Sequence, residues 1–333
     1  MSIDVLVTGS AGFIGGALVE RLRARGEQVA GADLRSGPLV DLCLDVTDAA
    51  AVREVFEAHR PRVVVHAAAL VDDRGDPALF ETVNVGGTRR MLEAARSAGC
   101  QRFVQVSSIA ALGITPGKNA DVHSPLIDDT GSPYFDTKAR SERIARSFME
   151  GDAMEVVVVR PGDVYGPGSI PWVERPLELM RKRQPVLLGG GRGLIAHCYI
   201  ENLLDGIELA MTHDDAPGGI FIIHDGSSST TCKDYFTQLA RAAGMSAPSV
   251  SMPKSVAYAV AGLAAVVHRL GGPPPPFTKS AVDYLTRQST YSIEEARRTL
   301  GYQPRVTLAA GMAALAAVLQ DHAPSASWRA GRM

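Results

Sequence analysis

Short apolar runs alternate with helical patterns along the first half of the chain. The apolar runs predict β-strands at 3–8, 28–32, 62–66, 102–107 and 155–160. Between them, apolar residues recur every three or four positions, which predicts helices at 13–25, 48–59, 77–98 and 133–150. Residues 156–159 are four valines in succession, as expected of a strand that is buried on both faces. This alternation predicts an α/β fold, a doubly wound parallel sheet with helices on both faces.

The regular alternation ends after Gly166. Turn-rich stretches follow, among them "GGPPPPF" at 271–277, which cannot form a helix or a central strand. Helical patterns at 172–183, 201–212, 232–243 and 308–320 lie among short strand candidates at 186–188 and 220–223. We therefore expect a smaller, interleaved C-terminal α/β domain formed by residues 166–199 and 226–325. The first domain would comprise residues 1–165 and return segments near 200–225.

Two further segments stand apart from this pattern. The residues between Ser108 and Pro133 have weak periodicity, and long irregular loops in compact domains often bind ligands. The segment 255–272 is almost entirely apolar as far as His268, but it is shorter than the roughly 20 residues that a bilayer span needs. We expect it to form a buried or lid-forming helix and no integral span. A helix resting on a membrane surface, or one facing an apolar substrate, stays open as an alternative.

The amino-acid composition bears on nucleic-acid binding, metal binding and cellular compartment. The 333 residues carry a net charge of −2, which does not favour nucleic acid. Four cysteines lie far apart, and eight histidines include no metal-binding motif, so we predict no metal site. No signal peptide is visible. Together with the cysteine spacing, this predicts a cytoplasmic protein.

Three glycines separate the first predicted strand from the first predicted helix. Gly9 would permit a tight turn, Gly12 a close approach of the backbone to a pyrophosphate, and Gly15 close packing of the helix on the strand. Backbone N–H groups at the N-terminus of that helix attract an anion. The arrangement is typical of a Rossmann dinucleotide-binding domain, which makes the smaller domain the substrate domain.

An acidic residue after the second strand indicates which dinucleotide is bound. Asp33 stands 18 residues after Gly15, where a carboxylate binds ribose hydroxyls and repels a 2′-phosphate. This favours NAD over NADP. Arg35, two residues later, could accommodate that phosphate and keeps NADP as the less favoured alternative.

Three polar side chains form a candidate catalytic set. Tyr134 and Lys138 are four apart on a predicted helix and therefore lie on one face. A phenol has a pKa of about 10, and a nearby ammonium would lower it and make the pair an acid–base unit. Ser107 and Ser108 end a predicted strand, where a hydroxyl can bind a substrate oxygen.

These residues occur within a series of motifs that resembles one family. The series comprises "TGSAGFIG" (8–15), "HAAA" (66–69), "NVGGT" (84–88), the Ser108–Tyr134–Lys138 set, "RPGDVYGPG" (160–168) and "YSIEEARRTLGYQP" (291–304). It is similar in order and spacing to the extended short-chain dehydrogenases/reductases of the NAD-dependent epimerase/dehydratase superfamily. The resemblance covers about 300 residues.

The resemblance implies a role for each matched residue. Tyr134 would be the catalytic acid–base, Lys138 would bind the nicotinamide ribose and lower the phenol's pKa, and Ser108 would orient the reacting oxygen. Asn84 would be a structural brace. The residues expected to contact the cofactor are Gly9, Gly12, Phe13, Ile14, Gly15, Asp33, Asp45, Val46, Ala67, Ala68, Lys138, Pro161 and Val164. Relatives commonly form homodimers through helices like 77–98 and 133–150, so we expect a homodimer.

Three functions are compatible with this resemblance. The first is an oxidoreductase of the 3β-hydroxysteroid dehydrogenase branch, which the "YIENL" form at 199–203 and the apolar 255–270 helix favour. It would act on a small apolar molecule, a 3β-hydroxysteroid or a long-chain 3-oxo compound. The second is a nucleotide-sugar epimerase that retains NAD, in which Arg192 could hold a diphosphate. The third, a dinucleotide sensor without activity, is disfavoured because all three catalytic residues are present. Ile109 and Ala110 stand where dehydratases carry an acidic pair, which disfavours dehydration.

Overall fold

The computed structural model describes residues 3–72, 75–151, 153–273, 275 and 277–321. The expected domain boundaries at residues 1 and 325 lie outside these ranges, and so do two prolines of the 271–277 stretch. Within the described residues, no helix is both long and apolar enough to cross a bilayer.

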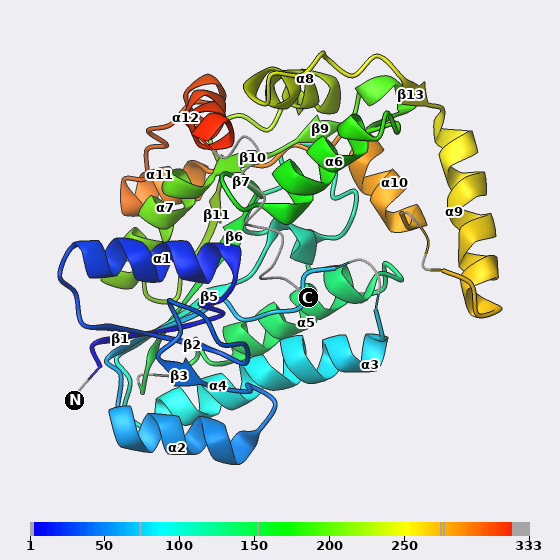
Figure 1. Ribbon diagram of the computed structural model, residues 1–333. Helices are drawn as coiled ribbons and strands as arrows, with labels where there is room; N and C mark the ends of the chain where they lie inside the picture. The colour runs from blue at the N-terminus through cyan, green and yellow to red at the C-terminus, as the bar shows by residue number, and fades with distance from the viewer. Residues whose placement is uncertain (1–2, 73–74, 152, 274, 276, 322–333) are drawn as a thin grey trace.

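A seven-stranded sheet forms the centre of the molecule (Figure 1), and each pair of neighbouring strands is parallel. Its strand order is β11-β6-β5-β4-β1-β2-β3. The strands are β1 (Val5–Thr8), β2 (Val29–Asp33), β3 (Leu42–Cys43), β4 (Val63–His66), β5 (Arg102–Val106), β6 (Glu155–Pro161) and β11 (Ile220–Ile223). This confirms the predicted doubly wound α/β fold.

Helices cover both faces of this sheet. In Figure 1, α1 (Phe13–Ala24) and α7 (Ile200–Thr212) lie on one face, and α2 (Ala49–His59), α4 (Gly87–Ser97) and α5 (Pro133–Ser147) lie on the other. Successive strand residues point to opposite faces, so Val5 and Val7 join one apolar cluster and Leu6 joins the other. Burial on both faces explains why the strands are continuous apolar runs.

Two elements in the first half of the chain differ from the prediction. Strand β3 has only two residues, too few for any periodicity, and it was not predicted. The predicted helix 77–98 is interrupted, because α3 (Pro77–Phe80) continues into a π-helix, η1 (Glu81–Gly86), before α4 begins. The predicted strand 220–223 is β11, which extends the main sheet beside β6.

The remaining elements lie beyond the carboxyl ends of the main strands. Short strands pair two by two: β7 (Asp163–Tyr165) with β10 (His197–Tyr199), β9 (Leu194–Ile195) with β12 (Thr230–Thr231), and β8 (Leu187–Leu188) with β13 (Ser251–Met252). The helices are α6 (Arg175–Arg181), α8 (Cys232–Ala242), α9 (Lys254–Arg269), α10 (Lys279–Thr286), α11 (Glu294–Leu300) and α12 (Leu308–Asp321). Short helical turns are η2 (Ile109–Leu112), η3 (Ile170–Glu174) and η4 (Gly189–Gly191). The division into two domains stays a prediction.

Helix α9 shows that the helix expected at 255–272 is not a buried one, while the lid-forming alternative stays a prediction. It packs on α10 at the outer edge of the molecule (Figure 1), and of its residues only Ala257 and Ala261 are buried. Its apolar residues fit a core helix by composition, but the fold leaves them without a second layer to cover them.

Candidate active site

The predicted site residues lie at one edge of the sheet. Asp33 and Pro161 end their strands, while Gly9, Ala67 and Ser107 directly follow theirs. Because these strands are parallel, their carboxyl ends meet at the same edge. Strand β1 lies between β2 and β4, so the direction of winding reverses beside the glycine turn, which is where such sheets bind ligands.

The glycine turn has no room for side chains. Gly9 has φ +76°, and a Cβ on it would lie 2.8 Å from the Ala67 carbonyl carbon. A Cβ on Gly15 would lie 2.3 Å from the Gly9 carbonyl oxygen. Helix α1 starts at Gly12 without a side-chain cap and without an acidic residue in its first turn. The compact turn and the uncapped N-terminus fit the pyrophosphate of a dinucleotide.

Asp33 ties the glycine turn to the end of β2. One oxygen of its carboxylate accepts a hydrogen bond from the Ala11 amide at 3.1 Å, and the other accepts one from the Arg35 amide at 2.9 Å. The Arg35 guanidinium lies 3.5 Å from the same carboxylate. Asp45 is one strand further along, where it accepts hydrogen bonds from the amide and hydroxyl of Thr47.

The other predicted cofactor contacts come from four segments. Phe13, at the start of α1, reaches the loop after β7, since a Cβ on Gly166 would lie 3.4 Å from its ring. Val164 is buried in β7. Val46 is buried beside Gly87, Ile14 packs against the core on the α1 side, and Ala68 donates its amide hydrogen to the Thr8 hydroxyl.

The three predicted catalytic residues lie on two adjoining elements. Ser108 begins η2, where its hydroxyl accepts a hydrogen bond from the Ala110 amide at 3.1 Å, and it also hydrogen-bonds the phenol of Tyr134. Tyr134 lies in the first turn of α5. Lys138 follows one turn later, buried, and its ammonium donates to the Val106 carbonyl at 2.7 Å.

The pKa of Tyr134 differs from the expectation. Burial raises it, the hydrogen bond from Ser108 lowers it, and the Asp163 carboxylate raises it, with a net upward shift. The effect of the Lys138 ammonium on this phenol stays a prediction. Burial also lowers the pKa of Lys138 to about 8, against the opposing effect of Glu142.

A fully buried ion pair lies behind the catalytic helix. Glu142, one turn beyond Lys138, accepts hydrogen bonds from Arg160 at 2.7 and 3.0 Å and from the Ser107 hydroxyl at 2.7 Å. Burial alone would raise the pKa of Glu142, but Arg160 and Ser107 hold it below its usual value. These bonds join α5 to the ends of β5 and β6 and so fix the helix that carries Tyr134 and Lys138.

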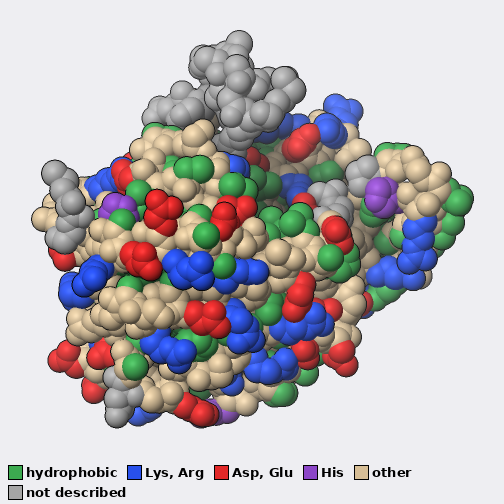
Figure 2. Space-filling model, turned by 90° about the horizontal axis from the view of Figure 1, so that it is seen from below, with side chains coloured by type: hydrophobic (Ala, Val, Ile, Leu, Met, Phe, Trp, Pro, Cys, Tyr) green, Lys and Arg blue, Asp and Glu red, His purple; other side chains and the backbone are tan. Residues whose placement is uncertain are grey.

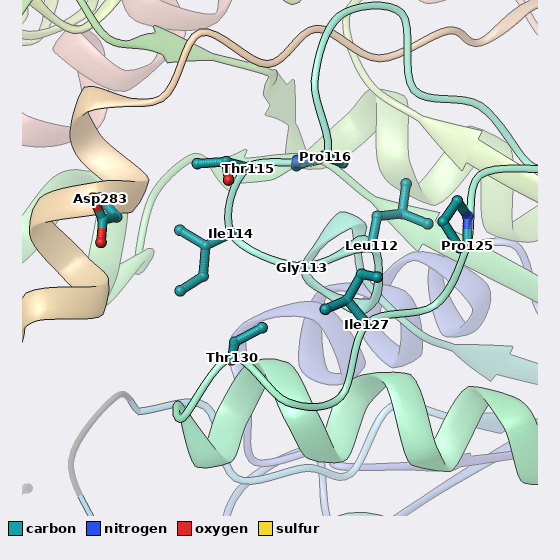
Figure 3. A pocket seen from close by; sticks show the side chains of 9 residues that line it. All are labelled: Leu112, Gly113, Ile114, Thr115, Pro116, Pro125, Ile127, Thr130 and Asp283. Carbon is teal, nitrogen blue, oxygen red and sulfur yellow. The ribbon is translucent and has the colours of Figure 1, made fainter.

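A cavity of about 510 Å³ lies between the loop after η2 and helix α10, and its volume is within the range typical of small-molecule sites. Ser108, Tyr134 and Lys138 are not among its lining residues. Figure 3 shows Thr130 beside the start of α5, Ile114 and Thr115 on the loop, and Asp283 on the facing helix α10. The full lining is Leu112, Gly113, Ile114, Thr115, Pro116, Pro125, Ile127, Thr130 and Asp283. The loop after Ser108, predicted as a binding loop, therefore supplies most of a cavity wall.

Comparison with known proteins assigns this arrangement to a family. Residues 5–223 match the NAD dependent epimerase/dehydratase family. The chain belongs to this family. A ketoreductase of Stigmatella aurantiaca that acts on a farnesyl dihydroquinoline oxide is 32% identical, with 93% of this chain and 94% of the relative aligned. The 3 beta-hydroxysteroid dehydrogenase/Delta 5-->4-isomerase of Mycobacterium tuberculosis is 30% identical, over 91% of this chain and 86% of the relative.

A solved structure of an epimerase is similar to this chain over nearly its whole length. The UDP-glucose 4-epimerase of Thermus thermophilus, in complex with NAD, superposes with a TM-score of 0.75. It is 27% identical, and the alignment covers 96% of this chain and 99% of the epimerase. The family thus includes relatives that are named dehydrogenases, reductases and epimerases.

Two sets of buried charged residues near the predicted catalytic residues were not predicted from the sequence. Glu142 and its partner Arg160 were not singled out, although Glu142 continues the spacing of Tyr134 and Lys138 by four residues. The second group is Asp163, which accepts hydrogen bonds from Arg287 and from the Tyr284 hydroxyl, both at 2.6 Å. Its partners lie more than 100 residues away in sequence, so no local pattern could indicate this pairing.

The burial of His66 predicts that the folded protein loses stability at acidic pH. Burial and the Lys138 charge lower the pKa of His66 to about 3, from 6.5. Between these values the unfolded chain binds a proton that the folded protein does not, so stability is complete above pH 6.5 and falls as pH decreases. At pH 5 the resulting loss in the free energy of unfolding is about 2 kcal/mol. We expect His66→Gln to reduce the loss of unfolding free energy between pH 7 and pH 5 by about that amount.

Urea unfolding at the two pH values measures this effect. His268→Gln is the matched control, because this histidine is exposed. An H66Q protein with the same pH dependence as the unmodified protein would rule out His66 as the source.

Proposed function

We propose that this protein is an NAD-dependent oxidoreductase that transfers hydride between the nicotinamide and a secondary alcohol or ketone of an apolar substrate. The observation that carries the proposal is the apolar cavity formed by the loop that joins η2 to the start of α5, the two elements that carry Ser108 and Tyr134. Among its described lining residues, five are Leu, Ile or Pro and none is lysine or arginine. Two relatives support it, since their names specify a hydroxysteroid and a farnesyl compound as substrates.

The chain's own residues supply proton transfer and orientation. NAD, when bound, supplies the hydride acceptor or donor. The Tyr134 phenol would give a proton to the substrate oxygen in reduction and take it in oxidation, while Ser108 holds that oxygen by a hydrogen bond. Because the pKa of Tyr134 is raised, the phenol is protonated near neutral pH, the form that reduction requires. The Lys138 ammonium would stabilise the phenolate that oxidation requires and bind the ribose.

The second candidate is a nucleotide-sugar epimerase, which the likeness to the Thermus thermophilus enzyme favours. A diphosphate is normally held by arginine or lysine. Arg287 is committed to the Asp163 carboxylate, with the guanidinium 3.5 Å from the Tyr284 ring centroid, and Arg192 is exposed. The described cavity wall offers no arginine or lysine, and its one charged side chain, Asp283, is already paired with Lys254 at 2.9 Å.

Thermal unfolding in saturating NAD separates these candidates. We expect a 3β-hydroxysteroid or a long-chain 3-oxo compound to raise the melting temperature, because a ligand that binds only the folded state stabilises it. UDP-glucose should leave it unchanged. Stabilisation by UDP-glucose alone would reverse the order of the two candidates.

Asp33 should set the preference for NAD. Replacing it by asparagine removes the negative charge that would face a 2′-phosphate, so D33N should raise the kcat/KM ratio of NADP to NAD about tenfold. Initial rates with each cofactor measure this ratio. Asp48→Asn is the matched control, because Asp48 caps α2 and asparagine also caps helices. An unchanged ratio in D33N would remove Asp33 from the cofactor site.

Three finer statements belong to the same proposal. Residues 166–199 and 226–325 would form the substrate domain. The chain would pair as a homodimer through α5 and the helical segment from α3 to α4, and the enzyme would act in the cytoplasm. The predicted cofactor contacts from Gly9 to Val164 are likewise part of the proposal.

A further inference from the structure

Helix α9 presents an apolar face to solvent. Val256, Leu263 and the C-cap residue Leu270 are seven residues apart and so form one row along the helix, with Val266 and Val267 beside it. These five side chains are between 43% and 83% exposed. Ala257 and Ala261 lie on the opposite side, where Ala257 packs with Val282 of α10. The large apolar residues of α9 therefore face solvent, and small residues face the protein.

Basic side chains predominate around this face. No aspartate or glutamate occurs from Tyr235 to Val282, although 36 of the 333 residues are acidic. The same stretch carries Lys254 at the start of α9, His268 and Arg269 at its end, and Lys279 at the start of α10. Lys254 pairs with Asp283 of α10 at 2.9 Å, while Arg269 and Lys279 are exposed. Figure 2 shows this part of the molecule as a lobe at the right-hand edge that carries hydrophobic and basic side chains.

A second copy of the chain fits this face poorly. A helix of 16 residues is about 24 Å long and about 10 Å wide, so its outer face offers roughly 240 Å², against the roughly 800 Å² per partner of a stable interface. Paired helices also use complementary acidic and basic residues beside their apolar seam. Two copies of α9 would bring only basic residues together.

We propose that the outer face of α9 binds the surface of an anionic lipid membrane. Apolar side chains on one face, the exposed cations Arg269 and Lys279 beside it, and no acid within the helix match a helix that lies in the headgroup region. Binding would place α10, which contributes Asp283 to the cavity wall, beside the lipid. Entry of an apolar substrate from that lipid is a consequence that rests on the proposed function, whereas the binding surface does not.

Co-sedimentation of the full chain with vesicles tests the proposal. One vesicle contains phosphatidylcholine alone, and the other contains phosphatidylcholine and phosphatidylserine at about 3:1. We expect binding to the anionic vesicle and several-fold weaker binding to the neutral one. L263E should reduce binding to the anionic vesicle about tenfold, because it places a charge in the middle of the apolar row. Leu79→Glu, at an exposed leucine of α3, is the matched control and should bind like the unmodified protein.

Three results would overturn the proposal: no binding to either vesicle, equal binding to both, or unchanged binding of L263E. Light scattering after size exclusion adds an independent readout. A lower molar mass for L263E than for the unmodified protein would show that a second copy covers this face. Circular dichroism of L263E verifies that it folds, and V256E repeats the test two turns earlier in the helix. None of these outcomes depends on whether the protein turns over a substrate.

Discussion

Tyr134→Phe should lower kcat by about 10³-fold while the dissociation constant for NAD stays within about twofold of the unmodified value. The substitution removes one oxygen, the atom that hydrogen-bonds Ser108 and that would exchange a proton with the substrate. The aromatic ring stays, including its edge contact with Phe135, so the start of α5 should keep its structure. Initial rates and a fluorescence titration of NAD measure the two quantities separately.

Tyr302→Phe is the matched control for this substitution. Tyr302 follows α11, its hydroxyl donates a hydrogen bond to the His224 carbonyl at 3.2 Å, and it is not among the described lining residues of the cavity. The variant should keep the unmodified rate. A Y134F enzyme that retained more than about a tenth of the unmodified kcat would exclude the phenol as the acid–base, since such groups contribute at least about 100-fold.

Glu142→Leu should reduce the free energy of unfolding by about 3–5 kcal/mol. It leaves the Arg160 guanidinium buried with its main counter-charge removed, and both side chains of this pair are fully buried. It also removes the acceptor of the Ser107 hydroxyl. Urea unfolding at pH 7 measures the loss, and Glu178→Gln, which breaks an exposed pair with Lys182, should leave the unfolding midpoint unchanged.

The double variant makes this prediction specific to the pair. Arg160→Met should also be strongly destabilising, but E142L with R160M should cost much less than the two single changes added together, because neither charge is then left alone. Additive losses would mean that the two side chains act independently, and the account of α5 as a helix fixed by this pair would be wrong.

Local patterns predicted the central sheet because strands that are buried on both faces consist of continuous apolar runs, which are visible in the sequence. The turn at Gly9 and Gly15 was predictable for a similar reason, since packing leaves no space for a Cβ at either position. The two-residue strand β3 carries no periodicity and was missed. The outer face of α9 was also beyond prediction, because an apolar row on a helix does not say what covers it.

The candidate site divides in the same way. Tyr134 and Lys138 could be predicted as neighbours because four residues make one turn of a helix. The direction of the Lys138 ammonium could not, since it depends on the Val106 carbonyl of another element. The net upward shift of the phenol's pKa comes first from burial, which the spacing along the helix does not indicate either. The pairing of Asp163 with Arg287 likewise depends on how the end of α10 lies against β7 and has no local signal.

Release of reduced nicotinamide tests the central claim most directly. The purified protein is given NAD with a 3β-hydroxysteroid, with a long-chain 3-hydroxy compound, or with UDP-glucose, and NADH absorbance is followed together with the composition of the sugar nucleotide. We predict that at least one apolar alcohol yields NADH over many turnovers, that Y134F does not, and that UDP-glucose is unchanged. Conversion of UDP-glucose to its 4-epimer without net NADH, with every apolar alcohol inert, would contradict the account.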